Sequence, residues 1–149
     1  MSVFVWTRGL QGSGKTTYAR AWVAEDFVNR VRVNQDDLRG MMHDGMYLGD
    51  DTENAIKLAR RSLVARLLRT GYDVISDDCN LSPLDAEWVE GLAWVPDVQI
   101  VCVDLRDVPL DVCLKRNHGR EGRARIPEEV IRNLHTLYIE PLTASAHER

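Results

Sequence analysis

Short hydrophobic runs alternate with longer amphipathic stretches along the chain. Four runs rich in β-branched or aromatic residues, at 3–7, 31–34, 72–77 and 98–105, have the length and composition of β-strands. The intervals between these runs are long enough to hold helices, and strands that alternate with helices form a parallel sheet with right-handed crossovers. The pattern therefore predicts an α/β fold built on four parallel strands.

One interval carries a strong helix signal. A helix is expected at about 52–70, because one stripe of this segment is hydrophobic. The stripe consists of Ile56, Ala59, Leu63 and Leu67. Asp50 and Glu53 are spaced as a capping pair at its start, and Gly71 follows its end. Its cations are assigned to the solvated face; they are Lys57, Arg60, Arg61, Arg66 and Arg69.

Weaker helix signals occupy the remaining intervals. Helices are expected at about 16–29 and 109–117. Two more begin near Ser82 and Pro127, because serine is a good N-cap and proline fits the first turn of a helix. Each strand is therefore followed by at least one helix.

Composition narrows the class of protein. A chain of 149 residues, 44% hydrophobic and 28% charged, fits one domain, placed at 1–142, with a short polar tail at 143–149. No hydrophobic run approaches the roughly 20 residues of a membrane span, and no secretory signal is recognisable. The three cysteines have no Cys-x-x-Cys spacing, which favours reduced thiols in a cytoplasmic protein over a disulfide framework or a zinc site. Cys102 is expected to be a small buried core residue.

The segment after the first strand carries the clearest chemical signal. Residues 9–16 read Gly-Leu-Gln-Gly-Ser-Gly-Lys-Thr, which fits the phosphate-loop pattern Gly-x-x-x-x-Gly-Lys-Ser/Thr between a strand and a helix. Backbone N–H groups of such a loop cradle the phosphates of a nucleoside triphosphate, Lys15 reaches the β- and γ-phosphates, and Thr16 holds Mg²⁺. The expected nucleotide-binding residues of the loop are Gly12, Ser13, Gly14, Lys15, Thr16 and Thr17. The alternative is a glycine-rich turn with a solvated lysine.

A second candidate segment follows the second strand. In a doubly wound sheet its carboxyl end lies at the same edge as the phosphate loop, so Asp36 could orient an acceptor hydroxyl and take its proton. If a helix starts here, Asp36 and Arg39 share a face. In the alternative interpretation, Asn34 or Asp36 only caps that helix and Arg39 pairs with a carboxylate.

Polar residues also follow the third strand, in the run Asp77-Asp78-Cys79-Asn80. One of the two aspartates could hold a magnesium-bound water or orient the acceptor, and Asn80 could donate to a substrate phosphate. The alternative is that these side chains only cap a loop.

An arginine-rich segment lies near the carboxyl end, at 114–125. Planar guanidinium groups suit phosphate oxygens, and a mobile lid of this kind can offset the charge of a phosphoryl group in transfer. We expect Arg116, Arg120 and Arg123 to contact the nucleotide, with Arg125 as a competitor for these contacts. The alternative is a solvated basic loop.

In this order the four segments resemble the kinase domain of bacteriophage polynucleotide 5′-kinases, over about residues 3–138. Many kinases share the phosphate loop, so the specific part of the resemblance lies in the other segments. These are Asn34-x-Asp36-Asp37-x-Arg39, then Ile75-Ser76-Asp77 with Asn80-Leu81-x-Pro83, then Lys115-Arg116-Asn117 leading through arginines to Pro127.

The resemblance implies a P-loop kinase-type three-layer sandwich with strand order 2-3-1-4 and an arginine-rich lid. It implies transfer of the γ-phosphate of ATP or a similar triphosphate, with Mg²⁺, to the 5′-hydroxyl end of DNA or RNA in nucleic acid repair. Asp36 would be the general base, Arg39 would bridge the acceptor and the transferring phosphate, and Arg120 would stabilise the transition state. Asp78 matches the acceptor-binding aspartate by its spacing to an asparagine, whereas Asp77 matches it by its place after Ile-Ser.

Charge leaves other functions open. The net charge of −4 argues against a broad surface that coats nucleic acid, so a polynucleotide would be held at one end only. The same acidity slightly favours a kinase of a small molecule, such as a sugar, a nucleoside or a sugar nucleotide. A nucleotide-binding switch that performs no transfer is the third possibility.

Overall fold

A computed structural model describes residues 1–147 of the chain. Its centre is a parallel sheet of four strands in the order β2-β3-β1-β4. The strands are β1 (Ser2–Arg8), β2 (Arg30–Val33), β3 (Asp73–Ser76) and β4 (Val98–Asp104). Both the α/β class with four parallel strands and the expected strand order 2-3-1-4 are confirmed.

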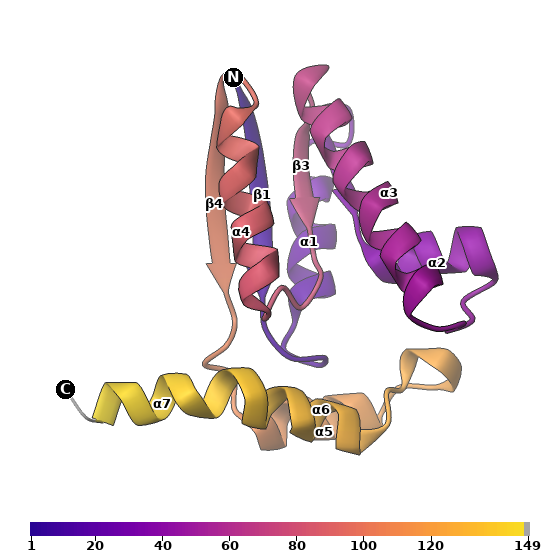
Figure 1. Ribbon diagram of the computed structural model, residues 1–149, viewed down its shortest axis with the longest axis vertical. Helices are drawn as coiled ribbons and strands as arrows, with labels where there is room; N and C mark the ends of the chain where they lie inside the picture. Colours follow the sequence, from indigo (N-terminus) through magenta and orange to yellow (C-terminus); the bar gives the residue numbers. More distant parts are fainter. Residues whose placement is uncertain (148–149) are drawn as a thin grey trace.

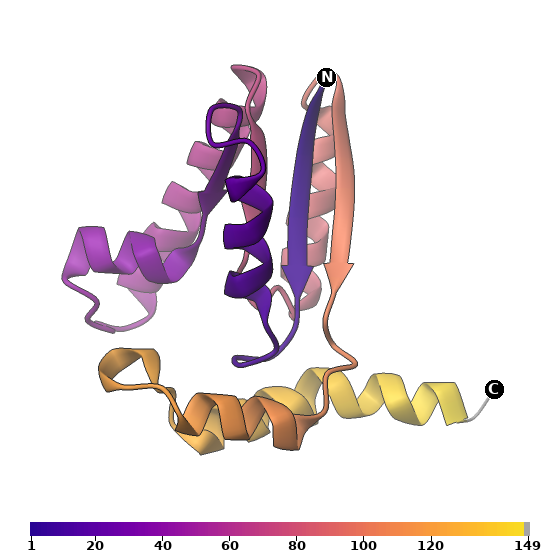
Figure 2. The ribbon, with the colours of Figure 1, turned by 180° about the vertical axis from the view of Figure 1, so that it is seen from behind.

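Helices cover both faces of this sheet. Figure 1 shows α3 and α4 on one face, and the opposite view in Figure 2 shows α1 on the other. The remaining helices α5, α6 and α7 lie across the carboxyl ends of the strands, and α2 lies beside the start of α3. The helices are α1 (Lys15–Ala24), α2 (Gln35–His43), α3 (Asp50–Arg69), α4 (Pro83–Gly91), α5 (Leu110–His118), α6 (Glu128–Leu134) and α7 (Glu140–His147).

The two faces of the sheet have separate hydrophobic cores because strand side chains alternate between faces. Phe4 and Val74 pack with Ile56 of α3 on one face, whereas Val5 and Ile75 pack with Ala19 of α1 on the other. This division confirms the predicted three-layer arrangement.

A third hydrophobic cluster lies beyond the carboxyl ends of the strands. It joins Leu10 of the phosphate loop and Leu81 to Cys113 of α5 and Ile131 of α6. The approach is close at Gly12, where an added Cβ would lie 2.5 Å from the Cys113 carbonyl oxygen. The φ of 84° at Gly12 also favours glycine. This cluster positions the arginine-rich lid over the phosphate loop.

The buried stripe of α3 differs from the predicted one. It consists of Ile56, Arg60, Val64 and Leu68. Leu63 of the predicted stripe is 40% exposed, whereas Arg60, which we assigned to the solvated face, is 0% exposed. The assignment of Arg60 was wrong because the polar loop after β3 and the ring of Trp88 supply it with buried partners.

Other boundaries also shifted. The first helix ends at Ala24 rather than near residue 29, because the Asp26 carboxylate accepts from the following backbone N–H groups and forms a turn. The residue before α3 is Gly49, and Glu53 binds Arg39 instead of capping the helix. Cys102 was predicted to be buried, but it is exposed on the edge strand β4 and belongs to none of the three clusters.

The C-terminal part is more helical than the sequence predicted. Residues 143–147 of the expected polar tail continue α7, and residues 148–149 lie outside the described residues. Within 1–147, no helix is both long enough and hydrophobic enough to cross a membrane.

Candidate functional site

The phosphate loop is folded around its lysine. Lys15 is the first residue of α1, is 8% exposed, and donates from Nζ to the Leu10 carbonyl oxygen at 2.6 Å. Gly14, immediately before the helix, has a φ of 104°, a left-handed conformation that glycine adopts without strain. The loop and the first turn of α1 thereby combine free backbone N–H groups with the positive end of a helix dipole, an arrangement suited to phosphate.

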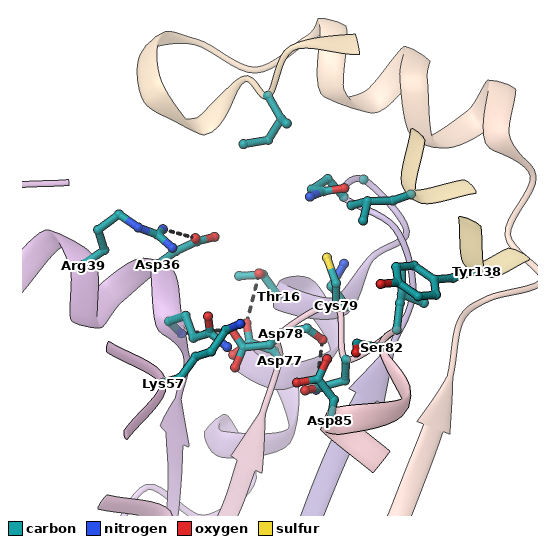
Figure 3. A pocket seen from close by; sticks show the side chains of 18 of the residues that line it. Thr16, Asp36, Arg39, Lys57, Asp77, Asp78, Cys79, Ser82, Asp85 and Tyr138 are labelled. Carbon is teal, nitrogen blue, oxygen red and sulfur yellow. Dashed lines mark hydrogen bonds and ion pairs between the residues drawn. The ribbon is translucent and has the colours of Figure 1, made fainter. Parts of the chain in front are cut away.

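A cavity of about 770 Å³ opens beside this loop. It is lined by the loop, the start of α2, one face of α3, the residues after β3, the start of α4 and the lid, and Figure 3 shows the side chains around it. A second hollow of about 640 Å³ lies at the other side of the loop, against Tyr18 and Arg116. Arg120 lines both, so the arginine-rich lid borders both hollows.

Asp77 links the phosphate loop to two strands. Its side chain is fully buried and accepts hydrogen bonds from Thr16 Oγ1 at 3.0 Å, Arg32 Nε at 2.9 Å and Asn34 Nδ2 at 3.1 Å. A hydroxyl and a carboxylate oxygen at this spacing are hard donors that suit Mg²⁺, which keeps several water and phosphate ligands. In the described residues no cluster of three acidic, histidine or cysteine side chains could hold a metal.

Asp78 also lines the cavity but has different partners, and its expected contact with an acceptor stays a prediction. It accepts from Arg60 Nη1 at 2.7 Å and Ser76 Oγ at 2.9 Å, and from the backbone N–H of Gln35 at 2.9 Å. Burial raises the pKa of the Asp78 carboxyl above its ordinary value, while the Arg60 charge acts in the opposite direction. Because Gln35 is the first residue of α2, the Arg60–Asp78 pair fixes the turn that carries Asp36.

Asn80 is directed toward the protein itself. Its Nδ2 donates to the Thr7 carbonyl at 2.9 Å and the Asp78 carbonyl at 3.2 Å, and its Oδ1 accepts from Arg60. Both N–H donors of the amide are therefore used within the chain. Its expected contact with a substrate phosphate stays a prediction that requires these bonds to rearrange.

Asp36 and Arg39 share a face at the mouth of the cavity, as the helix spacing predicted (Figure 3). The Asp36 side chain is 85% exposed and accepts from Arg39 Nη1 at 2.7 Å. Arg39 is held from its other side by Glu53 of α3 through bonds of 2.7 and 2.6 Å, which lower the pKa of the Glu53 carboxyl. The cap of α2 is Asn34, which accepts from the backbone N–H of Asp37 at 2.8 Å, so Asp36 is not needed as a cap.

The lid arginines have separate surroundings. Arg116 donates to the Gly12 carbonyl oxygen at 3.1 Å, and Arg123 donates to the Asp44 carbonyl in the loop after α2. Arg125 donates to carbonyl oxygens of the lid itself, at Arg120 and His118. Within residues 1–147 the Arg120 side chain has no hydrogen bond or ion pair and lines both hollows. The structure thus brings Arg116 and Arg120 to the phosphate loop. Arg123, which was expected to contact the nucleotide, lines neither hollow and contacts the loop after α2 instead.

Three residues of the site were not predicted from the sequence: Arg32, Glu53 and Arg60. Arg60 lies four residues after the buried Ile56 and four before the buried Val64, so its helix spacing was a usable signal. The ion pair of Glu53 with Arg39 crosses from one helix to the next, and no local pattern indicates it.

The buried Arg60–Asp78 pair leads to a prediction about stability. Arg60→Met should lower the free energy of unfolding by about 3–5 kcal/mol, because it leaves a carboxylate buried without its cation. Burial already raises the pKa of Asp78, so the folded variant binds a proton more readily than the unfolded chain. The loss should consequently be smaller at pH 5 than at pH 8 in urea denaturation.

The matched control Arg66→Met, exposed on the same helix, should change stability by about 0.5 kcal/mol or less. An equal loss at both pH values would contradict the assignment.

Comparison with known proteins agrees with this fold. A chain of the Pnkp1/Rnl/Hen1 RNA repair complex is 24% identical with a TM-score of 0.75, and the match covers 99% of this chain and 46% of that one. A chain from another structure of the Pnkp1/Rnl/Hen1 complex is 27% identical with a TM-score of 0.65, over 81% of this chain and 40% of that one. The present chain therefore spans less than half the length of these two relatives.

A small-molecule kinase has the same fold. The APS kinase CysC of Mycobacterium tuberculosis, in complex with AMPPNP and APS, is 18% identical with a TM-score of 0.63, over 79% of this chain and 69% of that one.

No curated protein matches the chain. Residues 4–141 match the AAA domain family. With its phosphate loop, parallel sheet and lid, the chain belongs to the AAA domain family and has the fold of the P-loop kinases.

Proposed function

We propose that the protein is a polynucleotide 5′-hydroxyl kinase that transfers the γ-phosphate of ATP, or a similar triphosphate, to the 5′ end of DNA or RNA. One observation carries the proposal. The exposed Asp36 carboxylate, oriented by Arg39, lines the same cavity as Lys15 and Thr16. A proton acceptor and a phosphate-binding loop that share one cavity are the minimum arrangement for transfer to a hydroxyl group.

Each residue has a physical task in this reaction. Lys15 and the N-terminus of α1 bind the phosphates of the donor, and Arg120 of the lid supplies positive charge to the transferring group. Asp36 orients the acceptor hydroxyl and accepts its proton, while Arg39 holds the carboxylate in place and offers donors to the acceptor. Thr16, whose hydroxyl donates to Asp77, would hold Mg²⁺, whose charge would help to neutralise the phosphates. Catalysis then rests on positioning and electrostatics.

The choice of a polynucleotide rests on the sequence segments around Asp36, Asp77 and the lid together with the two relatives from the RNA repair complex. A small-molecule acceptor is the second candidate, supported by the likeness to the APS kinase CysC. Both candidates use the same donor side of the cavity, so only the acceptor distinguishes them.

The deciding experiment measures transfer of labelled γ-phosphate to three acceptors under identical conditions. They are a 5′-hydroxyl DNA oligonucleotide, the matched RNA, and small acceptors that include a nucleoside and APS. We expect kcat/KM for at least one oligonucleotide to exceed that for the small acceptors by about 100-fold or more, equivalent to about 2.7 kcal/mol of additional binding to the transition state. Equal rates on a nucleoside and an oligonucleotide would overturn the proposal. ADP release that does not depend on any acceptor would instead indicate a nucleotide-binding switch.

A further inference from the structure

One face of α3 forms a wall of the cavity beside the phosphate loop. The residues of this face recur at the spacing of successive helical turns. They are Asn54, Lys57, Leu58 and Arg61. Two of them are cations, and neither belongs to the machinery described above.

Arg61 is held in place but is not neutralised. The Cζ atom of its guanidinium lies 5.7 Å from the centre of the Trp88 ring, and the Cζ atom of Arg60 lies 4.4 Å from the same ring centre. The Arg61 Nε is buried and has no hydrogen-bond partner, and within residues 1–147 no carboxylate lies within ion-pair distance of the side chain. Packing against the Trp88 ring therefore orients the Arg61 guanidinium, and no carboxylate of the described residues forms an ion pair with it.

Lys57 extends the same positive wall. It is exposed, lines the cavity in Figure 3, and forms no ion pair with any described residue. It lies one turn before Arg61, about 6 Å along the helix axis at 1.5 Å per residue. Both side chains are long enough to reach a single anionic group between them.

The acidic groups nearby are already engaged. Asp78 and Asp85 are paired with Arg60 at 2.7 and 3.6 Å, and Glu53 is paired with Arg39 at 2.6 Å. Arg60 is shared by these two aspartates, and Arg39 is shared by Glu53 and Asp36. The wall formed by Lys57 and Arg61 therefore presents two cations of α3 that no described carboxylate pairs, within a cavity, where water screens charge less than at an open surface. Such a wall favours a negatively charged ligand.

This wall also begins next to the proposed general base. The Arg39–Glu53 pair joins the turn of Asp36 to the first turn of α3, and Lys57 follows Glu53 by one helical turn. If the hydroxyl of an acceptor lies against Asp36, the group that follows its first sugar would therefore extend along α3. In a nucleic acid strand that group is a phosphodiester.

We propose that Lys57 and Arg61 form the binding site for the first internucleotide phosphate of the acceptor strand, an inference that rests on the proposed function. The site selects for acceptors that carry an anionic group one sugar away from the reacting hydroxyl. It accounts for end-on binding by a chain of net charge −4, because only one or two phosphates need be contacted. Lys57 and Arg61 are binding residues that do not touch the reacting atoms.

The test compares two 5′-hydroxyl dinucleotides that differ only in charge. One has the natural phosphodiester and the other a methylphosphonate linkage, which has nearly the same shape but no charge. For the unmodified protein we expect KM to be roughly tenfold or more lower with the charged dinucleotide, as is typical when a hydrogen bond to a charged group is lost. In the K57Q/R61Q double variant this preference should disappear through a rise in KM for the charged dinucleotide. The kcat values and the KM for the neutral dinucleotide should change less than threefold.

Arg66→Gln is the matched control, because it removes one exposed charge from the same helix outside both hollows. It should leave both KM values unchanged. The inference is overturned if the unmodified protein uses both dinucleotides equally, or if the double variant raises KM for both by the same factor. If neither dinucleotide is phosphorylated while a small acceptor is, the proposed function itself is wrong.

Discussion

Asp36→Asn should reduce the rate of phosphoryl transfer by about 10²–10⁴-fold, the range for loss of a general base. The amide cannot accept the proton of the acceptor hydroxyl, but its oxygen can still accept the bond from Arg39. Because the Asp36 side chain is 85% exposed and binds only Arg39, the fold should be unaffected. Nucleotide affinity should also persist, since no hydrogen bond or ion pair joins this carboxylate to the phosphate loop in the described residues.

The measurement combines single-turnover transfer of labelled phosphate with titration of a fluorescent ATP analogue. Asp37→Asn is the matched control, because Asp37 is adjacent, its side chain is 70% exposed, and its partner is Arg32 on the strand rather than Arg39. We expect that control to retain its rate within a few-fold. A variant Asp36→Asn with unmodified turnover would refute the role of Asp36.

Arg120→Ala should lower kcat by about 10³-fold or more, the effect expected when an arginine that stabilises a phosphoryl-transfer transition state is lost. Within residues 1–147 the Arg120 guanidinium has no hydrogen bond or ion pair, and its position at both hollows leaves it free to meet the transferring group. KM for ATP should rise much less than kcat falls, because the contact is strongest in the transition state.

Arg123→Ala tests the competing assignment within the same lid. Arg123 donates to the Asp44 carbonyl and lies near Met46 Sδ, both in the loop between α2 and α3. It therefore joins the lid to the acceptor side, and its loss should change kcat by less than about tenfold, as for a contact of about 1 kcal/mol. Steady-state kinetics of Arg120→Ala and Arg123→Ala compare the two losses of kcat. A larger effect at Arg123 than at Arg120 would exchange their roles.

Local patterns in the sequence predicted most of what positions the site. The phosphate loop depends on glycine conformations and on a strand-to-helix junction, both of which are encoded within about eight successive residues. The pairing of Asp36 with Arg39 follows from the spacing of one helical turn. These features need no knowledge of distant residues, and their relative positions in the structure agree with the expected ones.

The identity of the buried stripe in α3 could not be predicted as securely. Hydrophobic periodicity favoured Leu63 over Arg60, because burying a guanidinium is costly unless its partners are known. Those partners are Asp78 and Asn80, about 20 residues later in the chain, and they meet Arg60 only after the sheet has formed. The error arose from a contact between elements rather than from a weak helix signal.

The sequence by itself determined the α/β class, the strand order implied by its resemblance to known kinases, and the chemistry of the loop at 9–16. Only the tertiary structure decided that Asp77 contacts Thr16 whereas Asp78 anchors the base of α2. It also decided which lid arginine is free, and that Lys57 and Arg61 face a cavity. The reason is physical: conformational preference is a property of neighbouring residues, whereas the partner of a charge is fixed by which elements the folded chain brings together.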